Sequence, residues 1–170
     1  MKFIKTAAAA LVGIGLALAP VSAQAATTDQ ASGAGTLDEG ARHFSFNAKR
    51  LADGTVKGQA NLVNTSGPGK PFHLKINISC LKVEGNVAIF GGTGEGSGDP
   101  FFDGEAVFFA VQDNGEPGKD RDQISRVAAW DDLETDTGNP QACMVTTLAS
   151  LEADTGRPLE TIESGNIQVK

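Results

Sequence analysis

The stretch Phe72-His73-Leu74-Lys75-Ile76-Asn77-Ile78-Ser79 decides the fold class of this chain. Apolar and polar side chains alternate along it with a period of two, which is typical of a β-strand with one buried face. At Cys80-Leu81 the apolar series moves onto the odd-numbered positions, and a slip of one residue inverts the face that points inward. We therefore expect a β-bulge or a bend at Cys80.

Strand-like patterns continue on both sides of this stretch. Asp53-Gly54 and Gly85-Asn86 are typical of tight turns between strands. The run 106–111 is apolar on both faces, which predicts a central strand covered on both sides. A glycine-rich loop is expected over 91–100, and only 147–154 has the pattern of a helical turn or two. We expect strands over 44–48, 56–62, 72–83, 87–90, 106–111, 124–130, 143–148 and 167–170.

About eight short strands at hairpin spacing predict an all-β fold. We expect a single antiparallel β-sandwich or flattened barrel over residues 42–170. Residues 26–41 are rich in Ala, Thr, Ser and Gly and have no periodic apolar pattern, which is typical of a flexible linker.

Residues 1–25 have the layout of a cleavable secretory signal peptide. Lys2 and Lys5 make its start positive, and 6–19 is an uncharged, largely apolar run. Ala23-Gln24-Ala25 then supplies the small residues of a cleavage site. The apolar run of about 14 residues is shorter than the roughly 20 needed to cross a bilayer, so we expect no membrane span. The mature protein is expected to be secreted and extracellular, or periplasmic in a Gram-negative source.

The charge of the mature chain limits its partners. Cleavage removes Lys2 and Lys5 but no acidic residue, so the formal net charge falls from −7 to −9. An acidic surface repels phosphate backbones, which argues against nucleic acid as a partner. We expect an extracellular ligand or protein instead, whose identity the composition does not indicate.

Cys80 and Cys143 are the two cysteines of the chain. In an oxidising compartment an even pair predicts one disulfide, and closing a loop of this length would stabilise the fold by about 4 kcal/mol in the chain-entropy model. Two buried free thiols are the alternative.

The loop 113–122 is the strongest candidate for a ligand site. Asp113, Asn114, Glu116, Asp120 and Asp122 place several oxygen ligands close together, and calcium takes six to eight hard oxygens. The alternative is a tight turn, in which Asp113 accepts hydrogen bonds from the backbone amides of the loop and Gly115 and Gly118 take positive φ. Trp130 is a second candidate, because an exposed indole can stack on a ligand such as a sugar ring; a core or rim role is its alternative.

The catalytic motifs that we considered do not fit this chain. His43 and His73 are its histidines, and both fall on polar positions of strand patterns. Ser97 does not stand in the Gly-x-Ser-x-Gly frame of a serine nucleophile. We therefore expect no catalytic residues and no cofactor, with calcium bound by the 113–122 loop as the alternative. A hydrolase with paired carboxylates stays open as an alternative.

One family resemblance emerges from several short segments in order. They are 54–58 (Gly-Thr-Val-Lys-Gly), 80–88 (Cys-Leu-Lys-Val-Glu-Gly-Asn-Val-Ala), 111–118 (Val-Gln-Asp-Asn-Gly-Glu-Pro-Gly) with Asp122, and 165–169 (Gly-Asn-Ile-Gln-Val). In this order they resemble the post-COAP domain family of bacterial secreted proteins, over roughly residues 42–170. The resemblance implies an extracellular all-β module without an assigned catalytic mechanism. The sequence thus favours a noncatalytic module with a binding or structural role, with a calcium-stabilised domain and a hydrolase as alternatives.

Overall fold

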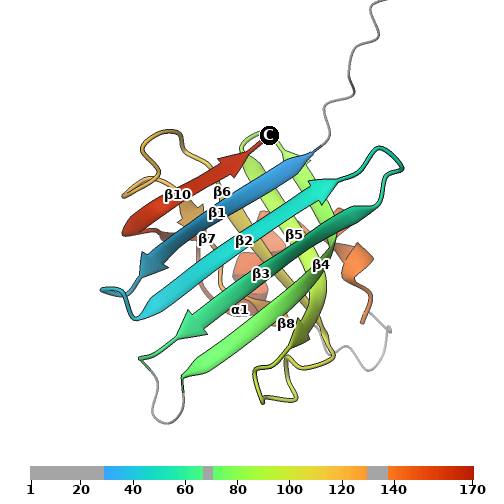
Figure 1. Ribbon diagram of the computed structural model, residues 1–170, viewed down its shortest axis with the longest axis horizontal. Helices are drawn as coiled ribbons and strands as arrows, with labels where there is room; N and C mark the ends of the chain where they lie inside the picture. Colours follow the sequence, from blue (N-terminus) through green and yellow to red (C-terminus); the bar gives the residue numbers. More distant parts are fainter. Residues whose placement is uncertain (1–28, 67–70, 130–137) are drawn as a thin grey trace, which may run out of the picture.

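The structure, a computed structural model, describes residues 29–66, 71–129 and 138–170. It confirms the all-β class: one antiparallel sheet curls into a half-barrel, with a short helical segment behind it (Figure 1). The elements are β1 (Gln30–Leu37), β2 (Arg42–Arg50), β3 (Val56–Asn64), β4 (Phe72–Glu84), β5 (Val87–Glu95), β6 (Ala106–Gln112), β7 (Gln123–Ile124), β8 (Ala128–Ala129), η1 (Pro140–Met144), α1 (Leu148–Thr155), β9 (Glu160–Thr161) and β10 (Ser164–Val169).

The sheet path runs β10-β1-β2-β3-β4-β5-β6-β7-β9, and β8 pairs with β6 off this path. Its two ends belong to one stretch of chain, because only Ile162 and Glu163 separate β9 from β10. This C-terminal stretch pairs first with β7 and then with β1. One continuous sheet therefore curls on itself, which is closer to the flattened barrel than to a sandwich of two sheets.

The bend predicted at Cys80 is confirmed. The pairing of β4 with β5 shifts register between Ile78 and Cys80. A bulge bends a strand and increases its twist. Figure 1 shows β4 curving so that β5 and β6 pass behind the layer of β1, β2 and β3.

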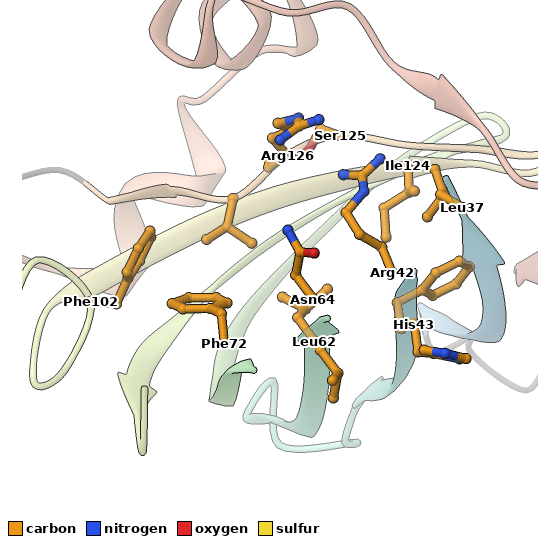
Figure 2. Close-up of a pocket in the computed structure, with 13 residues that line it drawn as sticks. Leu37, Arg42, His43, Leu62, Asn64, Phe72, Phe102, Ile124, Ser125 and Arg126 are labelled. Atoms are coloured by element: carbon orange, nitrogen blue, oxygen red, sulfur yellow. Dashed lines mark hydrogen bonds between the residues drawn. The ribbon is translucent and has the colours of Figure 1, made fainter. Parts of the chain in front are cut away.

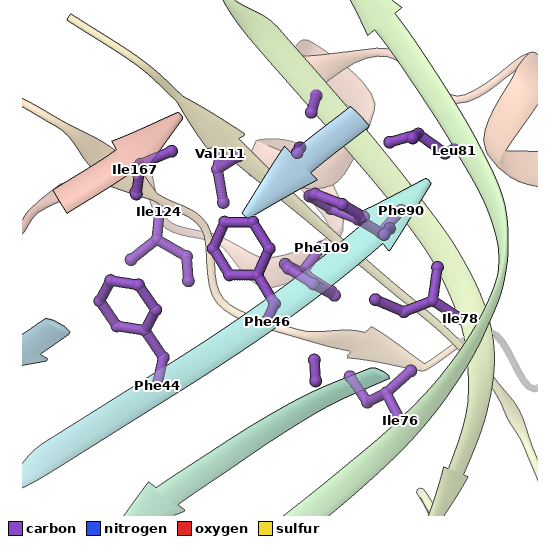
Figure 3. Packing of buried hydrophobic residues seen from close by; sticks show 14 of the residues in the cluster. Phe44, Phe46, Ile76, Ile78, Leu81, Phe90, Phe109, Val111, Ile124 and Ile167 are labelled. Atoms are coloured by element: carbon purple, nitrogen blue, oxygen red, sulfur yellow. The ribbon is translucent and has the colours of Figure 1, made fainter. Parts of the chain in front are cut away.

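The main core fills the space between these two layers (Figure 3). Phe46 from β2 meets Phe90 and Phe109 from β5 and β6 edge-on, with ring centroids 5.2 and 5.9 Å apart. Phe90 and Phe109 stack on each other at 4.4 Å. Each ring is at most 5% exposed, and burying such a side chain contributes about 1.5–3 kcal/mol.

The expectation of a strand covered on both faces is confirmed for β6, which is buried from Ala106 to Val111. Val107, Phe109 and Val111 face the main core. Phe108 belongs to a second cluster on the opposite face, which also contains Cys143 of η1 and Leu151 of α1. The helical segment therefore covers the outer side of β6.

The linker expected over 26–41 is wrong for residues 30–37, which form β1 between β2 and β10. The residues of β1 do alternate between the inner and outer faces of the sheet, but two of the inward residues, Gly33 and Gly35, are glycines. A Cβ on Gly33 would lie 2.9 Å from the Phe46 ring, and one on Gly35 would lie 2.3 Å from the Ser164 carbonyl oxygen. The large rings of β2 fill the space over β1, so the strand carries small residues and shows no apolar periodicity. The sheet domain thus begins before residue 42.

Two further local expectations are wrong. The loop expected to start at Gly91 starts later, because β5 continues to Glu95. The glycines there allow close packing: a Cβ on Gly91 would lie 2.1 Å from the Pro140 carbonyl oxygen. The strand expected over 143–148 is instead the end of η1 and the start of α1, where Thr147 and Ser150 form a capping box. The helical turns expected over 147–154 are confirmed as α1.

The predicted disulfide is confirmed: Cys80 of β4 is bonded to Cys143 of η1, with 6.1 Å between their Cα atoms. Both residues are at most 1% exposed, so the bridge fastens the helical segment to the bend of the sheet. Among the described residues, no helix is both long and apolar enough to cross a membrane. The predicted signal peptide, residues 1–25, lies outside the described residues.

Candidate functional site

The loop 113–122 connects β6 to β7 and packs against the edge of β10. The Asp113 carboxylate accepts the amides of Gly115, at 2.9 Å, and Val169, at 3.0 Å. The Asp122 carboxylate, fully buried, accepts those of Asn114, at 2.8 Å, and Ile167, at 2.7 Å. The turn interpretation is thus confirmed at Asp113. The two aspartates also cap the edge of β10 that does not face β1, where an open edge would leave backbone donors without acceptors.

The other predicted calcium ligands do not converge with these aspartates. Glu116 accepts the side-chain amides of Asn166, at 2.7 Å, and Gln168, at 3.3 Å. The side chain of Asn114 donates to the Arg121 carbonyl, and that of Asp120 is 72% exposed. Within residues 29–66, 71–129 and 138–170, no group of three His, Cys, Asp or Glu side chains is arranged to hold a metal ion. Calcium binding by this loop stays a prediction.

The two glycines of the loop play different parts. Gly115 has the predicted positive φ, at 89°. Gly118 does not, which corrects the expectation; it is needed because a Cβ there would lie 2.0 Å from the Asp122 carboxylate. Its amide donates to the Asn166 side chain at 2.9 Å. The second candidate binding residue, Trp130, lies outside the described residues, so its role stays a prediction.

The structure reveals a pocket of about 270 Å³ that the sequence did not indicate. It lies at one end of the half-barrel, between the first inward residues of β2 and β4 and the segment that follows β7 (Figure 2). The side chains of Phe72 and Phe102 form one wall, with ring centroids 5.3 Å apart. The lining consists of Leu37, Arg42, His43, Phe44, Leu62, Val63, Asn64, Phe72, Phe102, Ile124, Ser125, Arg126 and Val127.

Two arginines line this mostly apolar pocket, and they share one counter-ion. Arg42 donates from Nη2 to Glu160 at 2.5 Å, and Arg126 donates from Nη2 to the other carboxylate oxygen of Glu160 at 3.1 Å. Arg42 also donates from Nε to Asp38 at 2.6 Å. The side chains of Arg42 and Glu160 are only 14% and 22% exposed, so this ion pair is less screened by solvent than a surface pair, whereas the Asp38 side chain is 50% exposed.

Arg42 has a counterpart at the other end of β2. The inner face of this strand begins with Arg42, ends with Arg50 and carries Phe44 and Phe46 between them. Arg50 pairs with Asp29 at 3.0 Å and donates to the Leu81 carbonyl. In the sequence, Arg42 and Arg50 stand on the same alternating positions as the apolar residues of this strand. This was the signal that could have shown where the core ends on either side.

A short loop positions the aromatic wall of the pocket. The Asp103 carboxylate accepts the backbone amide and the hydroxyl of Ser97, each at 2.8 Å, and the amide of Gly98 at 2.8 Å. These hydrogen bonds, those from Ser97 first, hold the pKa of Asp103 below its ordinary value. Because Phe102 precedes Asp103, the same bonds fix its ring against Phe72.

The histidines do not form a catalytic group with this pocket. His43 is at its rim but is exposed, and Figure 2 shows its ring pointing away from the other lining side chains. His73 is exposed on the outer face of β4. The pocket therefore offers apolar surface and arginine, a combination suited to binding an amphipathic molecule.

Comparison of the chain with family models, with curated proteins and with solved structures finds no match in any of the three. The resemblance to the post-COAP domain family therefore stays a prediction, and the pocket is interpreted from its own geometry.

Proposed function

We propose that this chain is a secreted, noncatalytic binding module whose pocket between β2, β4 and the segment after β7 holds a small, mostly apolar molecule. The pocket itself carries this proposal: side chains such as Leu62, Phe72 and Val127 leave about 270 Å³ unfilled between them. A concave, largely apolar site with a few polar groups is the usual form of a small-molecule site.

Secretion is supported by two features. The first 25 residues have the pattern of a signal peptide, and the Cys80–Cys143 disulfide is of the kind that persists in oxidising compartments.

The noncatalytic character is supported by the carboxylates at the pocket. A glycoside hydrolase needs two carboxyl groups facing each other across the substrate. In the part of the chain that the structure describes, the acids that form ion pairs with lining residues are Asp38 and Glu160, and both are bound to the guanidinium of Arg42. That guanidinium occupies the space between them, so we expect no hydrolytic activity from this pair.

Dye binding, with and without a side chain that fills the pocket, tests whether the pocket is a binding site. N-phenylnaphthylamine, a neutral dye that fluoresces in apolar sites, is titrated into the full mature protein. We expect saturable binding, and we expect Val127→Trp to weaken it about tenfold or more because the indole occupies the cavity.

Val145→Trp is the matched control, because Val145 is 79% exposed and lies outside the pocket. This variant should bind the dye like the wild type. Absence of dye binding by the wild type, or equal binding by the folded Val127→Trp variant, would rule out the pocket as the binding site.

A further inference from the structure

We infer that the ligand of this pocket is a monocarboxylate with an apolar body, whose carboxylate is bound by Arg42 and Arg126. The inference rests on the proposed function and specifies the class of ligand. It follows from the distribution of charge around the pocket.

Among the described residues, the charged side chains that line the pocket are two arginines with a fixed positive charge, and His43 lies at the rim. Their acidic partners, Asp38 and Glu160, are not among the lining residues. Within the described residues, the guanidiniums therefore face the pocket, whereas the carboxylates that pair with them do not line it.

The two guanidiniums also keep hydrogen-bonding capacity. Arg42 uses Nε and Nη2 toward its acids, and Arg126 uses the same two nitrogens toward Glu160. Among the described residues, Nη1 of neither arginine has a hydrogen-bond partner. A guanidinium presents five N–H donors and pairs well with the planar geometry of a carboxylate. Asn64, the last residue of β3, also lines the pocket and adds a side-chain amide.

The position of the arginines determines how the ligand is oriented. Arg42 is the first inward residue of β2, and the next, Phe44, is buried in the core. Phe72 and Phe102 form the apolar wall. A ligand therefore places its carboxylate at the arginines and its apolar body against the aromatic wall. The volume of about 270 Å³ is near the lower end of small-molecule pockets, which favours a single alkyl chain over a bulkier body.

The test compares three ligands with the same alkyl chain: decanoate, decanol and decylammonium. Each displaces N-phenylnaphthylamine from the full mature protein at a pH well above the carboxyl pKa. Because a hydrogen bond to a charged group contributes about 1.5–3 kcal/mol, we expect decanoate to bind about tenfold or more tightly than decanol. Decylammonium should bind weakest.

Variants assign the preference to the arginines. Arg126→Gln should remove most of the difference between the affinities for decanoate and decanol. Arg157→Gln, which removes an exposed arginine elsewhere, should leave the difference intact. A measurement on the wild type alone complements them: added salt should weaken binding of decanoate and not of decanol.

The possible results separate the two proposals. If the dye binds but decanol displaces it as well as decanoate does, the ligand class is wrong and the pocket remains a binding site. A preference for decanoate that survives in the folded Arg126→Gln variant and is insensitive to salt also overturns the inference. If neither the dye nor any of the alkyl ligands binds, both proposals fail.

Discussion

Arg42 and Arg126 bind the two oxygens of one carboxylate, that of Glu160, although they lie on parts of the chain that are not neighbours in the sheet. Arg42 begins the inner face of β2, and Arg126 follows β7. Glu160 in β9 thus joins β2 to the segment after β7, next to two of the residues that line the pocket.

Replacing Glu160 by Gln should destabilise the fold. Arg42 and Arg126 would keep their charges but lose a shared acceptor, and Arg42 is only 14% exposed. Hydrogen bonds to charged groups contribute about 1.5–3 kcal/mol, and partial exposure reduces this, so we expect a loss of about 1–2 kcal/mol. Urea unfolding followed by circular dichroism measures it.

Glu84→Gln is the control for that substitution. Glu84 is paired with Lys82 at 3.1 Å, but its side chain is 63% exposed. An exposed ion pair contributes about 0–1 kcal/mol, so this variant should unfold close to the wild-type midpoint. Equal losses in the two variants would contradict a special role for Glu160.

Asp122→Asn should be the more damaging acid substitution. The buried carboxylate accepts the amides of Asn114 and Ile167, and an Asn side chain has one oxygen for these two donors. One backbone N–H would lose its acceptor, at a cost of about 2–3 kcal/mol. Asp120→Asn, at a side chain that is 72% exposed, should cost little. Thermal unfolding of the two variants side by side tests this. A loss of stability in Asp122→Asn as small as that in Asp120→Asn would argue against the capping of β10.

Calcium should leave the melting temperature unchanged. The carboxylate oxygens of Asp113 and Asp122 already accept backbone amides, whereas calcium needs six to eight oxygens directed at one point. Melting curves with calcium, with magnesium and with a chelator measure this directly. A rise that is specific to calcium and is lost in Asp113→Asn would instead establish the metal site predicted from the sequence.

Gly35→Ala should destabilise the first strand. The added Cβ would lie 2.3 Å from the Ser164 carbonyl oxygen and 2.8 Å from the Phe44 ring, so β1 and β10 would have to separate. Overpacking of this kind costs about 1–3 kcal/mol. Gly138→Ala is the control, since its Cβ would meet nothing within 4 Å. Hydrogen exchange of the β1 amides should be faster in Gly35→Ala than in the wild type and unchanged in Gly138→Ala. Wild-type exchange rates in Gly35→Ala would contradict the close packing of β1.

Much of the sheet was predictable because single strands carry their own signal. The alternation in β4, the slip at Cys80 and the two-sided burial of β6 were all evident from side-chain periodicity. The first strand was missed for a physical reason. Phe44 and Phe46 of the neighbouring strand occupy the space that inward side chains of β1 would fill. For this reason β1 carries glycine at two inward positions, where a strand usually has apolar residues.

The pocket was not predictable in this way. Its lining comes from β1 to β4, the loop before β6, β7 and the segment after β7, and no local pattern links these positions. Glu160 meets Arg42 from 118 residues away in the chain. The acidic loop drew attention because its residues are close in sequence, yet its aspartates are used to cap β10.

The sequence by itself determined the all-β class and the bend at Cys80, because these depend on local alternation, and it favoured the pairing of the two cysteines, which the structure confirms. Only the tertiary structure decided where the curled sheet leaves a space unfilled and which charges surround it. Curvature is a property of the whole sheet: the bulge in β4 and the C-terminal stretch that reaches both β7 and β1 bring distant inward side chains together. For that reason Arg42, Arg126 and Glu160 become one site only in the folded chain.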